Sequence, residues 1–513
     1  MRATLLSLFF INALALPLST FAQQRQPEQN GRAVELPASP VGRVVGALLK
    51  TLNDADASAQ LDFIRANFSE RMLEETPPDA WLTFFRKLRQ QSGGIDVMLV
   101  SPDSNERFLV LDVRSRRGNH WARMFFSLAR GGDAATAQKF SNVGIFGIRD
   151  PQLERADAWS QSKMPEADTL KEIKRHAERL AAEDRFSGVV LVARGERVVL
   201  QEAYGMAEKS FGVPNRVDTK FNLGSMNKMF TSVAIAQLVE RGKLSFQDTL
   251  AKVLPEYPNR QAAEKITVHH LLTHTSGLGD FFDNPQFRPH RERYVKPADY
   301  FPLFAAETLR FEPGARFGYS NAGFVVLGAI VERVSGQSYF DYVREHIYRP
   351  AGMTDSDSYE LTEVVPNLAV GYARFQDDPM GIDPRRSNVA FLPWRGSPAG
   401  GGYASAPDLL KFARALGAHK LLSAQMTELV TGAKVSMTGS PRAGAKYGYG
   451  FASEMLANAK EIRGHSGGGA NSGVNSSLLM FWDGSYTVVV TGNYDAPAAE
   501  NLAHKICDFL ARQ

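Results

Sequence analysis

The spacing of hydrophobic residues changes once within the first third of the chain, from that of helices to that of strands. Helical spacing of apolar residues recurs in three segments, Val41–Leu52, Leu61–Phe68 and Trp81–Leu88. The spacing then becomes that of strands in four segments separated by turn residues, Ile95–Val100, Arg107–Ser115, Trp121–Leu128 and Phe140–Ile148. Helices followed by a four-stranded meander predict a compact α+β domain over residues 39–150.

A second and larger folded region is predicted over residues 168–513, after a polar linker over residues 151–167. A charged helix over Asp168–Ala182 leads into two strands that meet at the tight turn Arg194-Gly195-Glu196. The middle of this region is helix and loop, rich in Gly and Pro. Four more strands and a closing helix are expected at Tyr447–Met455, Lys460–His465, Val474–Phe481, Tyr486–Asn493 and Pro497–Ala511.

The first residues have the pattern of a secretory signal peptide over residues 1–22. Arg2 is followed by an apolar run from Leu5 to Leu16, and small residues up to Ala22 offer a cleavage site. The run is too short to cross a bilayer, and we expect no membrane span elsewhere. Residues 23–38 are polar and are expected to be disordered. The sequence therefore predicts an exported protein, either periplasmic or secreted.

Composition narrows the classes of function. The 513 residues carry a net charge of only +4 without blocks of like charge, so we expect no nucleic-acid partner. Cys507 is the only cysteine, so the fold has no internal disulfide and rests on packing. Its neighbours Ile506, Phe509 and Leu510 indicate a small core residue rather than a reactive thiol.

The most informative chemistry is the segment Ser225-Met226-Asn227-Lys228. Residues three apart on a helix share a face, so the hydroxyl of Ser225 and the amine of Lys228 can meet. A serine hydroxyl becomes a nucleophile when a neighbouring base takes its proton, and a helix N-terminus can stabilise negative charge. The structural alternative is a helix cap beside a solvated lysine. Ser160-Gln161-Ser162-Lys163 fits the same pattern, but it lies in polar linker without an apolar helix behind it.

Two further segments carry candidate chemistry. Tyr319 and Asn321, two residues apart, can face one cleft, although this segment taken alone favours a half-buried aromatic and a helix cap. The run from Gly464 to Gly469 contains His465 and fits either a place of close backbone approach or a plain glycine-rich turn. His269, His270, His274 and His290 lack a carboxylate at zinc-helix spacing, so we assign them structural roles and expect no metal.

Taken in order, S-x-x-K, Tyr-x-Asn and the late His-x-Gly segment resemble the serine β-lactamase and penicillin-binding-protein superfamily. The closer resemblance is to the branch of class C β-lactamases, D-alanyl-D-alanine carboxypeptidases, D-aminopeptidases and esterases. Three segments support it: Leu-Leu-Thr-His-Thr-Ser-Gly-Leu at 271–278, Phe-Glu-Pro-Gly-Ala-Arg-Phe-Gly-Tyr-Ser-Asn-Ala-Gly around Tyr319, and Pro-Ala-Gly-Gly-Gly-Tyr-Ala-Ser-Ala-Pro-Asp-Leu at 398–409. The preceding domain is similar, in element order alone, to the cystatin-like fold.

The resemblance implies an α/β (α+β) domain with a five-stranded antiparallel sheet, flanking helices and an all-helical lobe. Ser225 would be the acylated nucleophile, and Lys228 and Tyr319 would share proton transfer. Asn321, His465, Gly467 and Gly468 would bind and orient the substrate, with the oxyanion between the N–H groups of Ser225 and Gly468. The resemblance implies no cofactor and a small-molecule or short-peptide substrate. It leaves the oligomeric state open.

His465 departs from the lysine usual in relatives that process penicillins. An imidazole with an ordinary pKa of about 6.5 is mostly neutral at pH 7 and attracts a carboxylate weakly. We therefore expect an esterase or a D-amino-acid peptidase or amidase rather than an efficient β-lactamase. The alternatives are a binder or sensor of the penicillin-binding type that acylates slowly or not at all, and a metal hydrolase built on His269–His290.

Overall fold

The computed structural model describes residues 34–513 except 55, 103, 130–137, 149, 152, 154–157, 375–377, 379, 439–441, 443 and 470. The described residues form two compact units. Among the described residues, the first contains those from 34 to 158 together with those of 374–385, and the second contains those of 159–373 and 386–513. The expected signal peptide and the expected disordered segment up to residue 33 lie outside the described residues. The domain boundaries drawn from the sequence remain predictions.

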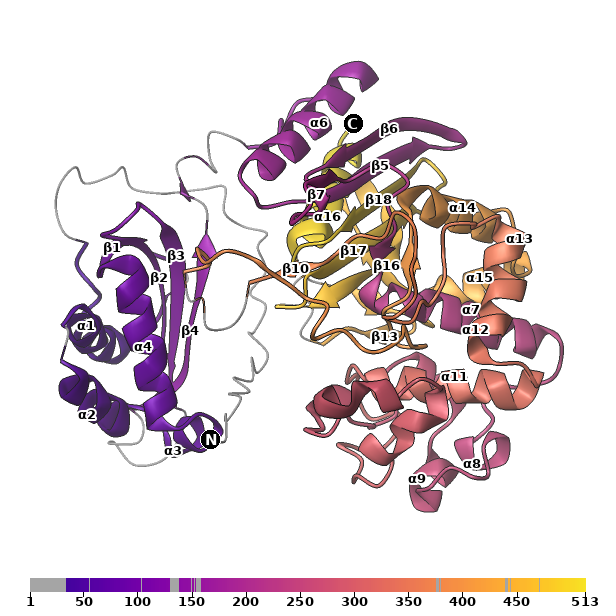
Figure 1. Cartoon of the computed structure of the whole chain (residues 1–513), viewed down its shortest axis with the longest axis horizontal. Coiled ribbons are helices and arrows are strands. Elements are labelled where there is room, and N and C mark those ends of the chain that lie inside the picture. The colour runs from indigo at the N-terminus through magenta and orange to yellow at the C-terminus, as the bar shows by residue number, and fades with distance from the viewer. Residues whose placement is uncertain are drawn as a thin grey trace. The chain divides into compact units, whose positions relative to one another are not determined.

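The first unit has helices followed by a meander (Figure 1). Its helices are α1 (Pro40–Asn53), α2 (Ala57–Asn67), α3 (Glu70–Glu75) and α4 (Pro78–Ser92). Its antiparallel sheet runs in the order β1 (Ile95–Val100), β2 (Phe108–Ser115), β3 (Trp121–Leu128) and β4 (Phe140–Ile148). Alternate residues such as Leu109, Leu111 and Val113 enter the core because strand side chains alternate between faces. The likeness to the cystatin-like fold stays a prediction.

A short segment from far along the sequence completes the first unit. Met380 is 2% exposed and belongs to the same hydrophobic core as α1 and α4. The side-chain amide of Gln91 donates to Asp378 Oδ1 at 2.8 Å and to Asp383 Oδ1 at 2.7 Å. Hydrophobic periodicity could not predict this contact, because a methionine in a polar loop belongs to no periodic pattern.

The second unit is built on one antiparallel sheet (Figure 1). Its order is β13 (Val435–Ser436), β14 (Lys446–Tyr447), β15 (Ala452–Met455), β16 (Glu461–Gly469), β17 (Val474–Phe481), β18 (Tyr486–Gly492), β5 (Gly188–Arg194) and β6 (Arg197–Tyr204). The five long neighbouring strands, β16 to β6, confirm the expected β-lactamase-like sheet. Three short strands extend it on the β16 side.

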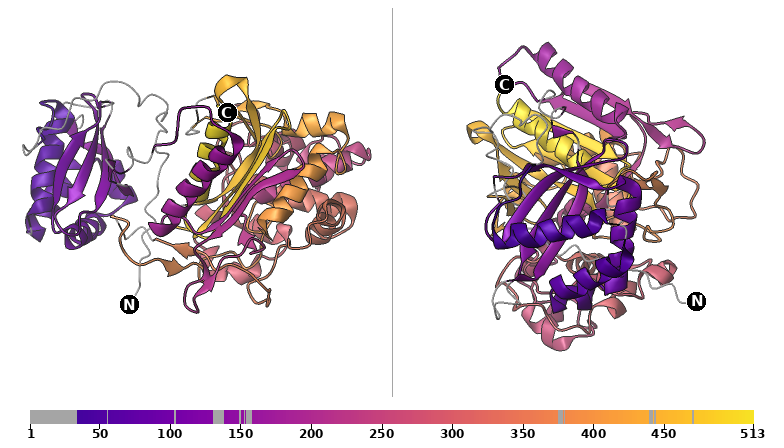
Figure 2. Two further views of the ribbon diagram at one scale, coloured as in Figure 1. Left: turned by 90° about the horizontal axis from the view of Figure 1, so that it is seen from above. Right: turned by 90° about the vertical axis from the view of Figure 1, so that its left-hand side faces the viewer.

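Both faces of this sheet are covered, as Figure 2 shows. Val190 and Val192 of β5 share a core with α6 (Glu166–Ala182) and α16 (Ala498–Leu510). Val189 and Leu191 point to the other face and share a core with α7 (Asn227–Glu240). A strand buried on both sides is apolar at nearly every position, which explains the run Gly-Val-Val-Leu-Val-Ala in β5.

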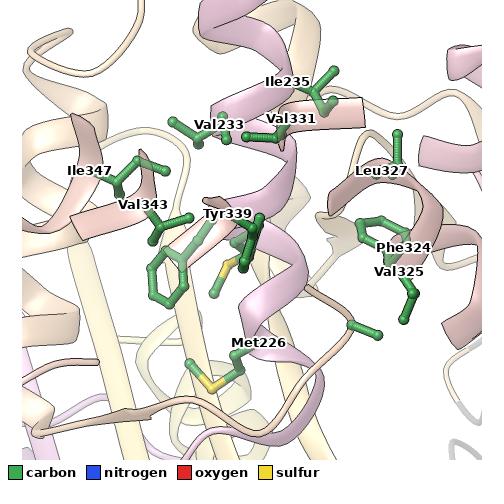
Figure 3. Close-up of a cluster of buried hydrophobic side chains, with 14 of the residues drawn as sticks. Met226, Val233, Ile235, Phe324, Val325, Leu327, Val331, Tyr339, Val343 and Ile347 are labelled. Carbon is green, nitrogen blue, oxygen red and sulfur yellow. The ribbon is translucent and has the colours of Figure 1, made fainter. Parts of the chain in front are cut away.

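Helix α7 runs through the centre of the larger core and is buried from Asn227 to Leu238. Val233 and Ile235 of this helix belong to the same hydrophobic core as Phe324, Val325 and Leu327 of α11, and Figure 3 shows side chains of both helices. The expected helical lobe consists of α8 (Leu250–Val253), α9 (Arg260–Lys265), α10 (Val268–Leu272), α11 (Asn321–Ser335), α12 (Tyr339–Val343), α13 (Arg349–Ala351) and 3₁₀ and π turns. Helices α14 (Ala406–Gly417) and α15 (Ala424–Thr431) follow in the sequence.

The remaining strands are short and pair two by two. They are β7 (Met206–Glu208) with β8 (Val213–Pro214), β9 (Phe221–Asn222) with β12 (Tyr403–Ala404), and β10 (Tyr372–Ala373) with β11 (Arg386–Ser387). None of the helices in the described part of the chain combines the length and apolar character needed to cross a membrane.

Two strand predictions near the end of the chain were wrong in extent. The strand expected over Lys460–His465 continues through the glycines to Gly469 and stays paired with β17. The strand expected over Tyr447–Met455 is broken in two, because Gly450 has a positive φ of 74° that strands do not use. Of the two readings of these glycines, a plain turn and a place of close backbone approach, β16 shows the second, because another segment lies against the strand there.

Candidate active site

Ser225 lies in a 3₁₀ turn, η2 (Gly224–Met226), that leads directly into α7. Gly224 has a φ of 50°, which glycine adopts without strain. Lys228 follows in the first turn of α7 and is completely buried, whereas Ser225 is partly accessible. The Nζ atom of Lys228 lies 3.2 Å from Oγ of Ser225. The i,i+3 spacing therefore brings the hydroxyl and the amine together as the sequence predicted.

The segment Ser397-Pro398-Ala399 fixes the first turns of α7. Three consecutive carbonyl oxygens accept hydrogen bonds from three side chains of the helix. Asn227 donates to Ser397 at 3.1 Å, Thr231 to Pro398 at 2.7 Å and Lys228 to Ala399 at 2.6 Å. The sequence predicted no chemical role for this segment, although Pro398 and Ala399 open one of the segments that carried the family resemblance.

The amine of Lys228 has three hydrogen-bond acceptors around it: Ser225 Oγ, Ala399 O and Asn321 Oδ1, the last at 2.8 Å. Burial lowers the pKa of this lysine from 10.5 to about 7, and Asp280 acts in the opposite direction. A neutral amine keeps two N–H groups and one lone pair. With the two N–H groups directed at Ala399 and Asn321, the lone pair faces the hydroxyl of Ser225.

Asn321 is held between Lys228 and a carboxylate that sequence reasoning missed. Its Nδ2 donates to Asp280 Oδ2 at 2.6 Å, so its Oδ1 is the atom that faces Lys228. Ser320, not Asn321, caps α11, which leaves the amide of Asn321 free for this role. Asp280 follows the segment 271–278 that supported the resemblance, and that neighbourhood was the one available signal.

Tyr319 lies over the amine, with Lys228 Nζ 4.7 Å from the centre of its ring. Its side chain is 38% exposed, so one edge of the ring borders solvent. Burial of the hydroxyl raises the pKa of Tyr319 well above 10, although a hydrogen bond with Ser225 lowers it somewhat. At neutral pH the group is therefore a phenol, which can donate a proton to an oxygen or nitrogen beside Ser225.

His465 is buried at 7% exposure, and both of its ring nitrogens have protein partners. Nε2 lies 3.0 Å from the hydroxyl of Tyr447, and Nδ1 contacts the carbonyl oxygen of Ser466. Burial, with a smaller effect from Lys228, lowers the pKa of His465 to about 3, so the imidazole is neutral at pH 7. It presents neither a charge nor a free nitrogen to a substrate carboxylate.

Strand β16 passes so close to Ser225 that only glycine fits. A Cβ atom on Gly467 would lie 1.9 Å from the carbonyl oxygen of Leu223 and 2.5 Å from the amide nitrogen of Ser225. A Cβ atom on Gly224 would lie 2.4 Å from the amide nitrogen of Gly468. The predicted oxyanion donors, the N–H groups of Ser225 and Gly468, thus belong to two segments in direct contact.

Three of the four histidines considered as metal ligands, His269, His270 and His274, have separate partners. His269 Nδ1 lies 2.8 Å from the hydroxyl of Tyr449, and His270 accepts from the backbone of Thr267 in a capping box. His274 contacts Ser320 and Tyr447. Within the described ranges there is no group of three or more His, Cys, Asp or Glu side chains arranged to hold a metal ion.

Comparisons with known proteins agree with this geometry. Residues 173–511 match the family model described as Beta-lactamase. PbpX of Bacillus subtilis (strain 168), named for penicillin binding, is 31% identical over 268 residues, 52% of this chain and 62% of PbpX. The esterase EstB of Burkholderia gladioli is 30% identical over 303 residues, 53% of this chain and 76% of EstB. A penicillin binding protein from Bacillus halodurans aligns with a TM-score of 0.56 and 32% identity, over 65% of this chain and 98% of that one.

A serine beside a buried lysine, at the edge of an antiparallel sheet flanked by helices, defines a class of serine hydrolases with a β-lactamase-like fold. The family model covers more than half of the chain, so the protein belongs to the Beta-lactamase family. It is a serine hydrolase of that family, and the esterase EstB is among the proteins to which it is similar.

Gly467→Ala tests the close approach of β16. The added methyl group cannot fit against Leu223 and Ser225, so β16 must move away from η2 and widen the space between the two oxyanion donors. We expect kcat/KM for an activated ester to fall by about 100-fold or more. Gly469→Ala is the matched control, because its Cβ would meet nothing nearer than 3.7 Å. Equal activity of the two variants would contradict this role of Gly467.

Lys228 and Asp280 predict a specific pH dependence. Lys228 accepts a proton from Ser225 only when neutral, so kcat/KM should rise with pH through about 7. Asp280 raises the pKa of Lys228, so Asp280→Asn should shift this limb to lower pH by about one unit. Asp283→Asn, on a neighbouring exposed carboxylate paired with Arg310, should leave the limb in place. If the rise of kcat/KM with pH keeps its midpoint in Asp280→Asn, the pKa of Lys228 does not determine that midpoint.

Proposed function

We propose that the protein is an exported esterase that cleaves uncharged carboxylic esters through an acyl-enzyme on Ser225. The observation that carries the proposal is the buried amine of Lys228, 3.2 Å from Ser225 Oγ, with Asn321 and Ala399 as its other partners. A pKa near 7 leaves a large fraction of this amine neutral at physiological pH. The signal-peptide pattern of residues 1–22 supports export.

In the proposed reaction Lys228 takes the proton of Ser225 while Oγ attacks the ester carbonyl carbon. The negative charge that forms on the carbonyl oxygen is stabilised by the N–H groups of Ser225 and Gly468. Tyr319 gives its phenolic proton to the departing alkoxide and recovers one from the ammonium of Lys228, so the alcohol leaves neutral. A water molecule then attacks the acyl-enzyme by the same route and releases the carboxylic acid and free Ser225.

The polarity of the site supports an uncharged acyl group. His465 is neutral and both of its nitrogens are occupied. The N–H groups of Lys228 are directed at protein acceptors, and the nearest carboxylate to Asn321 is Asp280 at 2.6 Å. A substrate carboxylate would find a negative neighbour rather than a cation, which disfavours its binding. Efficient hydrolysis of β-lactams, which carry such a group, does not fit this site.

Amides of D-amino acids are the second candidate substrates. The feature that favours them is Tyr319, whose hydroxyl stays protonated well above neutral pH. Amide cleavage needs a proton on the leaving nitrogen, and this phenol lies beside Ser225 to supply it. Esters remain the first proposal. An alkoxide leaves more readily than an amine, so its departure depends less on a proton from Tyr319.

Ser225→Ala is the first test of the proposed nucleophile. The variant should lose covalent labelling by a fluorophosphonate and essentially all ester turnover, because it removes the hydroxyl that lies 3.2 Å from the amine of Lys228. Ser160→Ala, in the linker copy of the same short pattern, should keep both. Labelling retained in Ser225→Ala would refute the nucleophile. Stoichiometric labelling of the wild type without turnover would favour the binder or sensor instead.

A matched pair of esters tests the proposed charge preference. We compare 4-nitrophenyl butyrate with 4-nitrophenyl hydrogen succinate, which adds one carboxylate to an acyl chain of the same length. The neutral ester should have a kcat/KM about 100-fold higher, since the neutral imidazole of His465 supplies no positive charge to attract the added carboxylate. D-alanine 4-nitroanilide and a chromogenic cephalosporin complete the panel, and the cephalosporin should be the poorest substrate. Equal rates for the two esters would contradict the preference.

A further inference from the structure

A chain of buried hydrogen bonds lies next to the catalytic groups. It includes none of the side chains of Ser225, Lys228 and Tyr319. It links His274, in the loop after α10, to Tyr447 of β14 and His465 of β16. The three side chains are 0%, 1% and 7% exposed, so they do not reach a substrate. Its two ends are backbone groups, the N–H of Ser320 and the carbonyl oxygen of Ser466.

The end groups fix the direction of every hydrogen bond in this chain. The N–H of Ser320 donates to Nδ1 of His274 at 3.1 Å, so a neutral His274 carries its proton on Nε2. That proton faces the hydroxyl of Tyr447 at 3.3 Å. At the other end a carbonyl oxygen accepts only, so His465 must carry its proton on Nδ1. The hydroxyl of Tyr447 therefore accepts from His274 and donates to Nε2 of His465 at 3.0 Å.

Each end of the chain is attached to one wall of the catalytic site. The ring of His274 stacks on Tyr319 with 4.2 Å between ring centres, and its partner Ser320 stands between Tyr319 and Asn321. His465 lies two residues before Gly467 on the strand that contacts Ser225. His274 also has a positive φ of 57°, uncommon for a residue other than glycine, and its imidazole is held there by both contacts.

We propose that His274, Tyr447 and His465 form a strut that sets the distance between the Tyr319–Asn321 wall and the oxyanion strand β16. Tyr447 and His274 are then positioning residues for the hydrolysis proposed above, on which this inference rests. His465 orients the substrate through the backbone of β16 rather than by touching it. Both ends of the strut are closed by backbone groups, so it holds the two walls without passing protons between them.

Tyr447→Phe tests the strut, because it removes one hydroxyl and keeps the ring. Small misplacements of reacting groups are costly, so kcat for 4-nitrophenyl butyrate should fall about 10- to 100-fold with little change in KM. Tyr449→Phe is the matched control. It removes an equally buried hydroxyl, at 4% exposure, that contacts His269 at 2.8 Å outside the strut. It should lower the melting temperature by a similar amount and leave kcat within about twofold.

Four outcomes would overturn the proposal. The first is a Tyr447→Phe enzyme with wild-type kcat. The second is an equal loss of kcat in Tyr449→Phe at the same melting temperature, which would reduce the effect to stability. The third is a ¹⁵N NMR spectrum of the wild type at pH 7 in which His274 is not protonated on Nε2 alone, or His465 not on Nδ1 alone. Tyr447→Phe should also slow fluorophosphonate labelling of Ser225, and an unchanged labelling rate counts against the strut.

The proposed function and the strut fail in different ways. If the wild type turns over no ester or amide, the proposed function fails, while the tautomers and the labelling rates still decide the strut. If the wild type is active and Tyr447→Phe matches it, the strut alone fails.

Discussion

The burial of one amine without a carboxylate partner is the constraint on which the rest of the site depends. Lys228 is enclosed by α7, α11 and the segment 397–399, and its partners in the described part of the chain are a hydroxyl, an amide oxygen and a carbonyl oxygen. A direct ion pair would keep the amine charged. Asp280 instead acts through Asn321, near enough to raise the pKa of Lys228 but not to pair with it. This arrangement leaves a lone pair available to Ser225.

Such a group lowers stability. Displacing the pKa of Lys228 from 10.5 to about 7 corresponds to a few kcal/mol, at about 1.4 kcal/mol per unit. The unfolded chain binds this proton more tightly than the folded protein does. The resulting loss in the free energy of unfolding is therefore full below pH 7 and disappears as pH rises toward 10.5. The total stability of a domain is about 5–15 kcal/mol, so this is a large share. The close packing of Phe230, Val233 and Phe324 around the same helix offsets it.

Local patterns allowed much of this structure to be predicted. The period of apolar residues located the meander of the first unit and the long strands of the second, and the i,i+3 spacing placed Ser225 beside Lys228. What could not be predicted depends on contacts between distant segments. Tyr447 lies 173 residues from His274, and nothing in either neighbourhood indicates that their side chains meet. The glycines of β16 were ambiguous because their cause, the backbone of Leu223 and Ser225, lies more than 200 residues earlier.

The place of Met380 in the core of the first unit bears on how the two units depend on one another. A head-to-tail arrangement of two independent domains would give each domain a continuous stretch of chain. Here Arg374–Arg385, from the middle of the larger unit's sequence, belong to the smaller unit. Expression of the smaller unit alone, cut at the linker, would therefore yield a fragment without Met380 in its core. A single cut does not separate the two units along the sequence.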